Sequence, residues 1–496
     1  MLRKIRIVLA ALFFAGITLL FLDITGTAHK WLGWMAEIQL LPAILAVHAA
    51  IIVPLVLLTL MFGRVYCSVI CPLGVMQDII SWLNGRRSKK NRFRFSYSPA
   101  KNFLRYSVLG VFIALLTIGA NQIAVLIAPY SAYGKIASSL LAPLYQWGNN
   151  LFAWVAERAG SYAFYSTEVW MRSGATLITA TVTLAATGFL AWKYGRTWCN
   201  TICPVGSFLG LISRFSIFVP VIDTAKCKSC GLCEKQCKSS CINTKEHNID
   251  YSRCVACMDC IDTCKDGAVR YSIRKRKDRA IDETEQNGVS RRTFLTIGAI
   301  TVATATAKAQ KLKVDGGLAE IERAKKPVRS TPVIPAGSIS LKHFHQHCTS
   351  CQLCVSNCPN QVLRPSSALD TFMQPEMSFE RGYCRPECTN CSDVCPAGAI
   401  KPVTVEEKTS IQVGHAVIDL GSCVVNTDNV SCGNCARHCP ARAIRMVRKN
   451  PDNPESLKIP TVNEEKCIGC GACENLCPAR PFTAIHIEGH EVHRTI

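Results

Sequence analysis

The feature that most constrains this chain is a repeated spacing of its cysteines. Of the 496 residues, 29 are cysteine, and most of them fall into runs of the form Cys-x2-Cys-x2-Cys-x3-Cys or close variants of it. A chain of this length can bury a core without cross-links, and disulfide frameworks belong to small secreted scaffolds that show no such spacing. The runs therefore predict a chemical use for the thiols, namely the binding of iron–sulfur clusters.

Two runs of regular spacing lie in the middle of the chain. They are Cys227, Cys230, Cys233, Cys237 and Cys254, Cys257, Cys260, Cys264. In two-cluster domains the fourth cysteine of one run binds the other cluster. We therefore expect Cys264 to complete the first set and Cys237 to complete the second. Lys238 and Lys265 replace the proline that usually follows the fourth cysteine, and Cys241 has no assigned role.

Four further runs fill the C-terminal part, and each closes with Cys-Pro. They are Cys348, Cys351, Cys354, Cys358; Cys384, Cys388, Cys391, Cys395; Cys423, Cys432, Cys435, Cys439; and Cys467, Cys470, Cys473, Cys477. Structural zinc is the main competitor, but four-cysteine zinc sites lack the third close cysteine and the distant Cys-Pro. The spacing predicts six [4Fe-4S] clusters in all. Which fourth cysteine serves which C-terminal cluster stays open.

Four apolar stretches, near residues 5–22, 41–62, 103–128 and 174–193, are each about long enough to cross a bilayer. The net charge of +21 is concentrated beside them, since residues 1–309 carry +19 and residues 310–496 carry +2. This pattern indicates the positive-inside rule rather than a nucleic-acid surface. It places the N-terminus and the loop around Arg86 in the cytoplasm, and the segment from Tyr130 to Arg172 on the other side.

The second and fourth stretches end in nearly the same residues. The second stretch ends in Gly63-Arg64-Val65-Tyr66-Cys67-Ser68-Val69-Ile70-Cys71-Pro72-Leu73-Gly74, and the fourth ends in Gly195-Arg196-Thr197-Trp198-Cys199-Asn200-Thr201-Ile202-Cys203-Pro204-Val205-Gly206. This internal repeat predicts two helix pairs related by an axis along the membrane normal. The four thiols Cys67, Cys71, Cys199 and Cys203 would then meet as a soft-metal site or as two redox dithiols. Structural thiols or lipidation are the alternatives.

A twin-arginine pattern separates the two cysteine-rich parts. Arg291-Arg292 precedes a short apolar run that closes with Ala307-Lys308-Ala309, which is typical of a Tat-type export signal. An interfacial segment or a buried core helix is the alternative. Cleavage after Ala309 stays open.

The chain is thus expected to have several domains, with an α-helical membrane domain of four spans and bacterial-ferredoxin-like α+β cluster domains. The expected boundaries are 1–222 for the membrane domain, 223–275 for a cytoplasmic two-cluster domain, 276–311 for the linker with the export signal, and 312–496 for a periplasmic four-cluster domain.

The first 275 residues resemble the NapH-type membrane ferredoxin of periplasmic nitrate reductase systems, with two Cys-x3-Cys-Pro turns and two cluster motifs. Residues 288–496 resemble the NapG-type (MauM/NapG) periplasmic ferredoxin. The resemblance implies a fusion of the two in the bacterial inner membrane, a component of a quinol dehydrogenase. It would take electrons from membrane quinol and pass them to a periplasmic reductase or cytochrome, such as nitrate reductase.

Quinol oxidation releases protons as well as electrons, so an ionisable group within a span is a candidate by default. His48 in the second stretch is that candidate, with Gln77 and Asp78 as weaker ones. Two other functions compete, a copper-handling maturation factor of the NosR or cupric-reductase type and a docking scaffold. One difficulty stays open, because nothing in the sequence carries electrons across the bilayer from the first two clusters to the last four.

Overall fold

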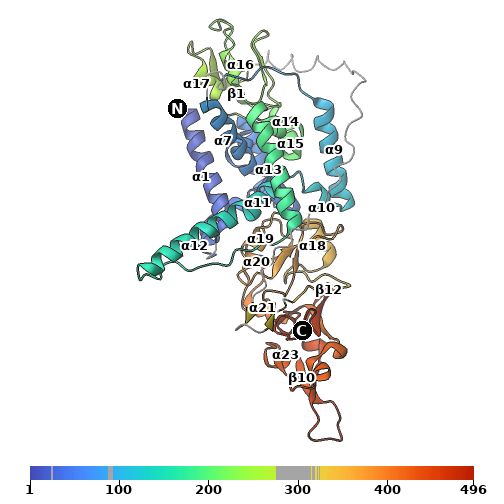
Figure 1. Ribbon diagram of the computed structural model, residues 1–496. Coiled ribbons are helices and arrows are strands. Elements are labelled where there is room, and N and C mark those ends of the chain that lie inside the picture. The colour runs from blue at the N-terminus through green and yellow to red at the C-terminus, as the bar shows by residue number, and fades with distance from the viewer. Residues whose placement is uncertain (24–25, 88–92, 275–313, 316–318, 321, 323) are drawn as a thin grey trace, which may run out of the picture.

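The computed structural model describes residues 1–23, 26–87, 93–274, 314–315, 319–320, 322 and 324–496. A helical bundle stands in the middle, with a small cysteine-rich domain at each end (Figure 1). We call residues 218–274 the first cysteine domain and residues 324–496 the second cysteine domain. The expected export signal with Arg291, Arg292 and Ala309 lies outside the described residues.

Two of the four expected spans are helices long and apolar enough to cross a membrane, judged by length and composition within the described residues. They are α1 (Leu2–Leu22) and α13 (Gly174–Tyr194). The second expected span is divided into α4 (Leu40–Leu45) and α5 (Ala49–Phe62). Val47, with a φ of 54°, interrupts the helix between them.

The third expected span is also shorter than the sequence suggested. Helix α9 (Asn102–Ile118) ends where Gly119 takes the left-handed conformation, with a φ of 88°. The separate helix α10 (Asn121–Ala124) follows it. The apolar run to residue 128 is therefore not one helix, because hydropathy does not register a C-terminal cap.

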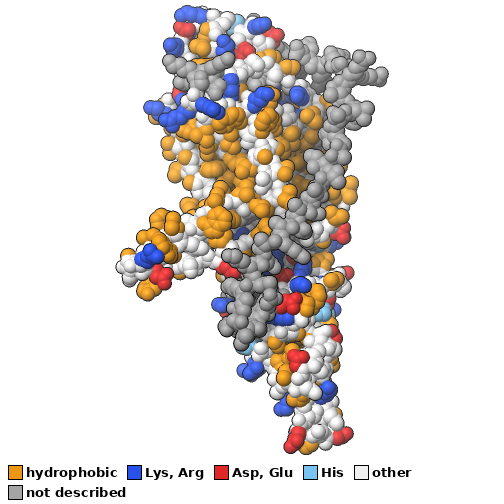
Figure 2. All heavy atoms as spheres, viewed as in Figure 1, with side chains coloured by type: hydrophobic (Ala, Val, Ile, Leu, Met, Phe, Trp, Pro, Cys, Tyr) orange, Lys and Arg blue, Asp and Glu red, His pale blue; other side chains and the backbone are white. Residues whose placement is uncertain are grey.

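A band of exposed apolar side chains covers the face of the bundle seen in Figure 2. Leu12, Val53, Val111 and Val182 are among them and are each more than half exposed. So much exposed apolar surface on one face marks a protein or membrane contact. Together with α1 and α13, it indicates that the bundle associates with a membrane.

The repeated sequence forms two helix–turn–helix units. In the first, α5 leads through α6 (Val65–Val69) to α7 (Pro72–Arg87), and in the second α13 leads through α14 (Thr197–Thr201) to α15 (Pro204–Ser213). A proline begins the last helix of each unit, where its missing N–H costs nothing. Each turn therefore directs its two cysteines into the interior of the bundle.

Short helices connect the bundle to the second cysteine domain. They are α2 (Thr27–Leu32), α3 (Trp34–Glu37), α11 (Pro129–Ile136), the π-helical η1 (Ala137–Leu141) and α12 (Ala142–Arg158). Helix α12 projects away from the bundle near the second cysteine domain (Figure 1), with Trp147 and Trp154 exposed along it. Exposed tryptophans at this end of an apolar bundle are typical of the interface between a bilayer and water.

The first cysteine domain is a small α+β unit. Strand β1 (Phe218–Ile222) pairs antiparallel with β4 (Val269–Ile273), and β2 (Ile242–Asn243) pairs with β3 (Asn248–Ile249). The helices are α16 (Leu232–Gln236) and α17 (Asp259–Thr263). Phe218 stacks on Phe62 at the end of α5, with 5.6 Å between ring centroids, so the domain is attached directly to the bundle.

The second cysteine domain has two similar halves. Its elements are α18 (Leu341–His347), α19 (Leu353–Ser356), β7 (Leu363–Pro365), β8 (Pro375–Met377), α20 (Asn390–Asp393), α21 (Val405–Ser410), β9 (Ile411–Ile418), η4 (Leu420–Ser422), α22 (Val424–Thr427), α23 (Asn434–Arg437), β10 (Ile444–Arg448), β11 (Lys458–Val462), η5 (Glu464–Lys466), α24 (Ala472–Asn475) and β12 (Ile485–Thr495). Strands β7–β8, β10–β11 and β9–β12 pair antiparallel. The short strands β5 (Val314–Asp315) and β6 (Ala319–Glu320) precede the domain and also pair antiparallel.

Candidate functional site

The two cysteine runs of the first cysteine domain exchange their last members. The Cys233 thiol lies within electrostatic range of Cys227, Cys230 and Cys264. The Cys260 thiol lies within the same range of Cys254, Cys257 and Cys237. The fold therefore assembles the two crossed sets that the sequence predicts.

The second cysteine domain makes the same exchange twice. One small cavity is lined by Cys348, Cys351, Cys354 and Cys395, a second by Cys384, Cys388, Cys391 and Cys358, and a third by Cys423, Cys432, Cys435 and Cys477. The Cys473 thiol stands in electrostatic range of Cys467, Cys470 and Cys439, which makes the fourth set. The fourth cysteines, which spacing left open, thus cross within two pairs of runs.

The loops of regular spacing share one backbone conformation. In each, the residues on either side of the middle cysteine have positive φ, as at Ser229 and Gly231, Ala256 and Met258, Ser350 and Gln352, and Gly469 and Gly471. Positive φ is uncommon outside glycine, so its recurrence at matching positions has a structural cause. Alternating turns of this kind point backbone N–H groups into a concavity that binds an anionic group.

Buried cations stand beside these cysteine sets. Lys135 is 1% exposed, and its Nζ has no hydrogen-bond partner in the described part of the chain. It lies in electrostatic range of Cys348 and Cys351. Lys408 donates to the carbonyl of Arg385 at 2.7 Å and to that of Cys388. Burying a cation costs much free energy unless negative charge lies beside it. A cluster bound by thiolates supplies that negative charge.

Burial makes the free thiols reluctant to ionise. It raises the pKa of Cys233 and Cys351 to about 11 and that of Cys470 to about 12. Cluster ligation needs thiolates, so the binding of iron would have to offset the free energy of deprotonating these buried thiols. No three His, Cys, Asp or Glu side chains of the described residues lie close enough to hold a single metal ion. Four-cysteine cavities, inward N–H groups and adjacent cations fit iron–sulfur clusters.

A further cysteine set lies inside the bundle. Cys67, Cys71, Cys199 and Cys203 are each 3–4% exposed, and the Cys203 thiol is in electrostatic range of the other three. The internal repeat therefore brings the four thiols together, as the duplicated sequence predicts.

Two arginines cross between the repeats at this site. Arg64 places Nη2 3.8 Å from the Sγ of its own Cys67 and 3.1 Å from the carbonyl of Cys199 in the other repeat. Arg196 places Nη1 3.9 Å from the Sγ of its own Cys199 and 2.8 Å from the carbonyl of Cys67. Both guanidinium groups are fully buried. Each repeat thus contributes one cation to the shared site.

A glycine two residues after each Cys-Pro pair leaves room for the arginine of the other repeat. A Cβ atom on Gly74 would lie 2.3 Å from the Cys67 carbonyl and 2.7 Å from Arg196 Nη1. A Cβ atom on Gly206 would lie 2.2 Å from the Cys199 carbonyl and 2.8 Å from Arg64 Nη2. Both contacts are too short for any other residue, which explains why the repeat extends to these glycines.

The two arginines differ in their partners. Arg196 donates Nε to Asp78 at 2.8 Å. Arg64 contacts Asn200 Oδ1 at 2.8 Å and the Ser252 carbonyl at 3.2 Å, and no carboxylate pairs with it in the part of the chain that the structure describes. A fully buried guanidinium without a carboxylate is costly unless the thiol site itself is negative.

A tyrosine pair lies between the bundle cysteines and the second cysteine domain. Tyr66 is in electrostatic range of Cys71, and Tyr130 is in range of both Tyr66 and Cys351. Helix α11, which carries Tyr130, packs so closely on the second domain that a Cβ on Gly134 would lie 2.2 Å from the Cys351 carbonyl. The bundle cysteines are therefore connected to both ends of the molecule, since Arg64 also contacts Ser252 of the first cysteine domain.

The remaining predicted residues lie elsewhere. His48, which the sequence placed within a span, caps the start of α5 and is exposed, because the helix breaks just before it. Gln77 accepts a hydrogen bond from Cys199 Sγ at 3.5 Å, and Asp78 faces a cavity described below. Cys241 is buried with its Sγ 3.5 Å from that of Cys237.

The sequence interpretation missed several residues of these sites. Arg64 and Arg196 stood within the repeated residues and could have been found there. Lys135 and Tyr130 carry no sequence signal, because only the packing of α11 brings them beside cysteines. Tyr66 directly precedes Cys67 in the repeat and could have been found there.

These observations define a class, the membrane-associated ferredoxin-type iron–sulfur proteins. Two family models match the chain, one described as a 4Fe-4S binding domain over residues 45–91 and 174–221, the other as a 4Fe-4S dicluster domain over residues 347–399 and 430–480. The first match covers both Cys-x3-Cys-Pro turns of the bundle, and the second covers most of the C-terminal runs.

Curated relatives give the family. The methylamine utilization ferredoxin-type protein MauM of Methylophilus methylotrophus is 32% identical over 196 residues, 38% of this chain and 80% of that protein. The chain belongs to this family of ferredoxin-type proteins. The ferredoxin-type protein NapH of Haemophilus influenzae is 26% identical over 249 residues, covering 48% of this chain and 72% of that protein.

Other matches are partial. The uncharacterized protein MJ0749 of Methanocaldococcus jannaschii is 40% identical over 100 residues, 20% of this chain, and the chain spans only 39% of its length. No solved structure matches the chain.

Proposed function

We propose that this protein conducts electrons from membrane quinol to a redox partner that docks on the second cysteine domain. The observation that carries the proposal is a series of four-cysteine sets running from the first cysteine domain, through the bundle, to the second. Electron transfer through iron–sulfur clusters is common to the family. The quinol donor and an acceptor such as a periplasmic nitrate reductase are the inferred ends of the series.

The bundle cysteines are inferred to hold a seventh, redox-active iron–sulfur centre. The buried Arg64 without a carboxylate supports a negative group there, and the family model named for 4Fe-4S binding covers both turns. Such a centre, continued by Tyr66 and Tyr130, would carry electrons through the bundle. It would remove the difficulty that the sequence presents, namely six clusters split between two sides of a membrane.

The proposed topology has four spans, formed by α1, by α5, by α9 and by α13. The first cysteine domain would lie in the cytoplasm and the second outside. The chain would combine a membrane ferredoxin and a soluble four-cluster ferredoxin in one polypeptide. An alkaline phosphatase fusion after residue 320 tests this arrangement, and an inactive fusion would place the second domain inside.

The function is tested on protein purified without oxygen. Menaquinol and ubiquinol analogues are added, and cluster reduction is followed by electron paramagnetic resonance. We expect reduction in both cysteine domains. If neither analogue reduces any cluster, the quinol-linked function is wrong.

A second arm examines the bundle centre with Cys67→Ser and Cys199→Ser. Ser68→Ala is the matched control, because Ser68 is equally buried on the same short helix but bears no thiol. We expect the cysteine variants to keep quinol reduction of the first domain and to lose that of the second. Copper bound at this site in the wild type, with unchanged electron transfer in the variants, would favour metal handling instead.

A further inference from the structure

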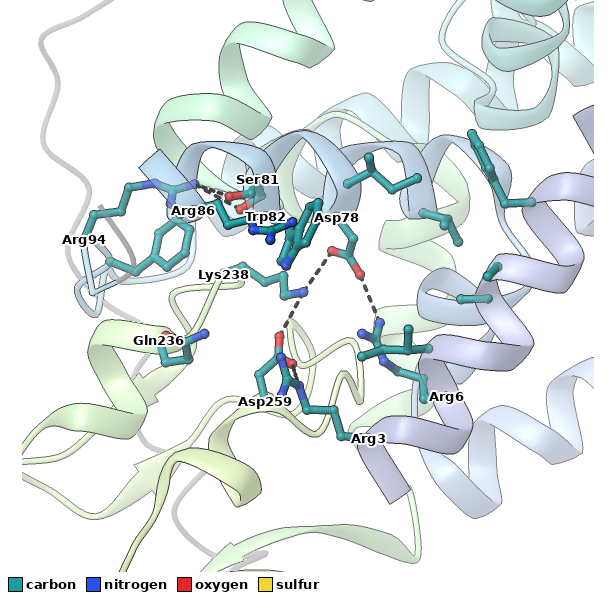
Figure 3. Close-up of a pocket in the computed structure, with 18 residues that line it drawn as sticks. Arg3, Arg6, Asp78, Ser81, Trp82, Arg86, Arg94, Gln236, Lys238 and Asp259 are labelled. Atoms are coloured by element: carbon teal, nitrogen blue, oxygen red, sulfur yellow. Dashed lines mark hydrogen bonds and ion pairs between the residues drawn. The ribbon is translucent and has the colours of Figure 1, made fainter. Parts of the chain in front are cut away.

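A large cavity lies between α1, α7 and the first cysteine domain. Its volume is about 810 Å³, within the range of sites that hold small organic ligands. Both apolar and charged side chains line it (Figure 3). None of the cysteine sets described above lines it, so it is a separate site.

One wall of the cavity is apolar and continues onto the outer surface of the bundle. Phe14 and Ala11 of α1 and Ile79 and Trp82 of α7 contribute to it. Ile79 and Trp82 are 40% and 53% exposed, so they belong also to the surface that would face lipid. An apolar ligand with a long tail could therefore enter from the bilayer.

The opposite end of the cavity is a network of ion pairs (Figure 3). Asp78 is bound by Arg196 Nε at 2.8 Å, Arg6 Nη1 at 3.0 Å and Lys238 Nζ at 3.3 Å. Lys238 continues to Asp259 at 2.9 Å. Burial alone would raise the pKa of Asp78, but its three cations together hold it well below its usual range. Asp78 is thus a fixed anion that positions the cations.

Two of the buried polar atoms at this cavity bear on its ligand, and each lacks a hydrogen-bond partner in the described part of the chain. They are Nε of Arg6, a donor, and Oε1 of Gln236, an acceptor, and both atoms are buried. Buried polar groups are nearly always hydrogen-bonded. An unpaired donor and an unpaired acceptor therefore indicate a ligand that can accept one hydrogen bond and donate another. A dihydroxy-aromatic ring does so, since each hydroxyl both donates and accepts.

The network also reaches a cysteine set. Lys238 follows Cys237 in the chain and is in electrostatic range of Cys257, and Asp259 precedes Cys260. A ring bound against Lys238 would lie next to the cluster that the set of Cys237, Cys254, Cys257 and Cys260 is proposed to hold.

We propose that this cavity is the quinol site, with the head group held between Arg6 and Gln236 and the tail along α1 and α7. The inference rests on the proposed function and gives it a location. One quinol gives up two electrons and two protons and becomes the quinone, and two oxidised iron–sulfur clusters each take one electron. The protons leave to solvent past Arg3, which lines the cavity and is paired with Asp262, itself 39% exposed.

The test uses the full chain in detergent with its clusters intact. Ala11→Phe fills the apolar wall, and Gln236→Leu removes the unpaired acceptor. Leu12→Phe is the control, because Leu12 lies on the same helix, is 59% exposed and does not line the cavity. Dithionite reduction, which needs no quinol site, measures the cluster content of each variant.

We expect Gln236→Leu to slow reduction by a quinol analogue about tenfold, the loss that follows when one hydrogen bond in a buried site is removed. Ala11→Phe should slow it at least as much, and Leu12→Phe should behave as the wild type. Dithionite should reduce all variants equally. If the wild type is reduced by quinol and both cavity variants match it, the site is wrong while the function stands. If the wild type is not reduced, the function itself fails.

A photoreactive quinone gives an independent readout. Labelling should map to α1 or α7 and be displaced by the quinol analogue. Displacement by an anionic phospholipid but not by quinol would overturn the proposal, because the cations would then bind a lipid phosphate.

Discussion

The buried charge of Arg64 leads to a quantitative prediction for the bundle centre. Its Nη2 lies 3.8 Å from Cys67 Sγ, and the guanidinium is fully buried. Two unit charges at about 4 Å interact by about 4 kcal/mol at an effective dielectric constant of about 20. The charge of a cluster is spread over several atoms, so we take about half of this, about 2 kcal/mol. For a one-electron couple that equals roughly 80 mV.

Removing this charge by Arg64→Met should therefore lower the reduction potential of one centre by roughly 80 mV, because the reduced form loses a stabilising cation. A redox titration followed by electron paramagnetic resonance measures it. Arg158→Met on α12 is the matched control, since that arginine stacks on the exposed Trp154, far from the bundle cysteines. An unchanged potential in Arg64→Met, with full iron content, would show that no redox centre lies beside Arg64.

Three further predictions concern the second cysteine domain. In Cys395→Ser we expect the cluster of the Cys348 run to be lost and that of the Cys384 run to be kept. The iron content should fall by one cluster, and one electron paramagnetic resonance signal should disappear. Gly134→Ala should push α11 off the Cys351 loop, because its Cβ would lie 2.2 Å from that carbonyl, and stopped-flow reduction of the second domain should slow while its iron content is kept. Burial, with His490 adding to it, lowers the pKa of His493 to about 4. The unfolded imidazole takes up a proton near pH 6.5 and the folded one does not, so stability should fall by about 3 kcal/mol between pH 6.5 and 4. Thermal unfolding of His493→Phe should lack this part of the pH dependence.

Local spacing was informative wherever the chemistry is local. Three cysteines within seven residues wrap one corner of a cluster, so the runs at Cys227 and Cys348 could be read directly. The crossed partner in the first cysteine domain could also be inferred, because only two runs are present there. In the second domain four runs allow several exchanges, and the fold of each half selects the exchange between its own two runs.

The helical part shows where hydropathy is insufficient. Apolar composition located the bundle, but the interruption at Val47 and the cap at Gly119 depend on single backbone conformations. His48 looked like a residue within a span and lies instead at the exposed start of α5. A hydrophobic window averages over such residues and cannot place them.

By itself the sequence determined the cysteine runs and the duplicated turns, because both are short patterns whose geometry follows from spacing along one segment. Only the tertiary structure decided which cations accompany them. Arg64 meets the carbonyl of Cys199, Lys135 meets the Cys348 run, and Gln236 faces helix α1 across a cavity. Buried charge is tolerated only where distant segments supply its counter-charge, and that meeting is a property of packing.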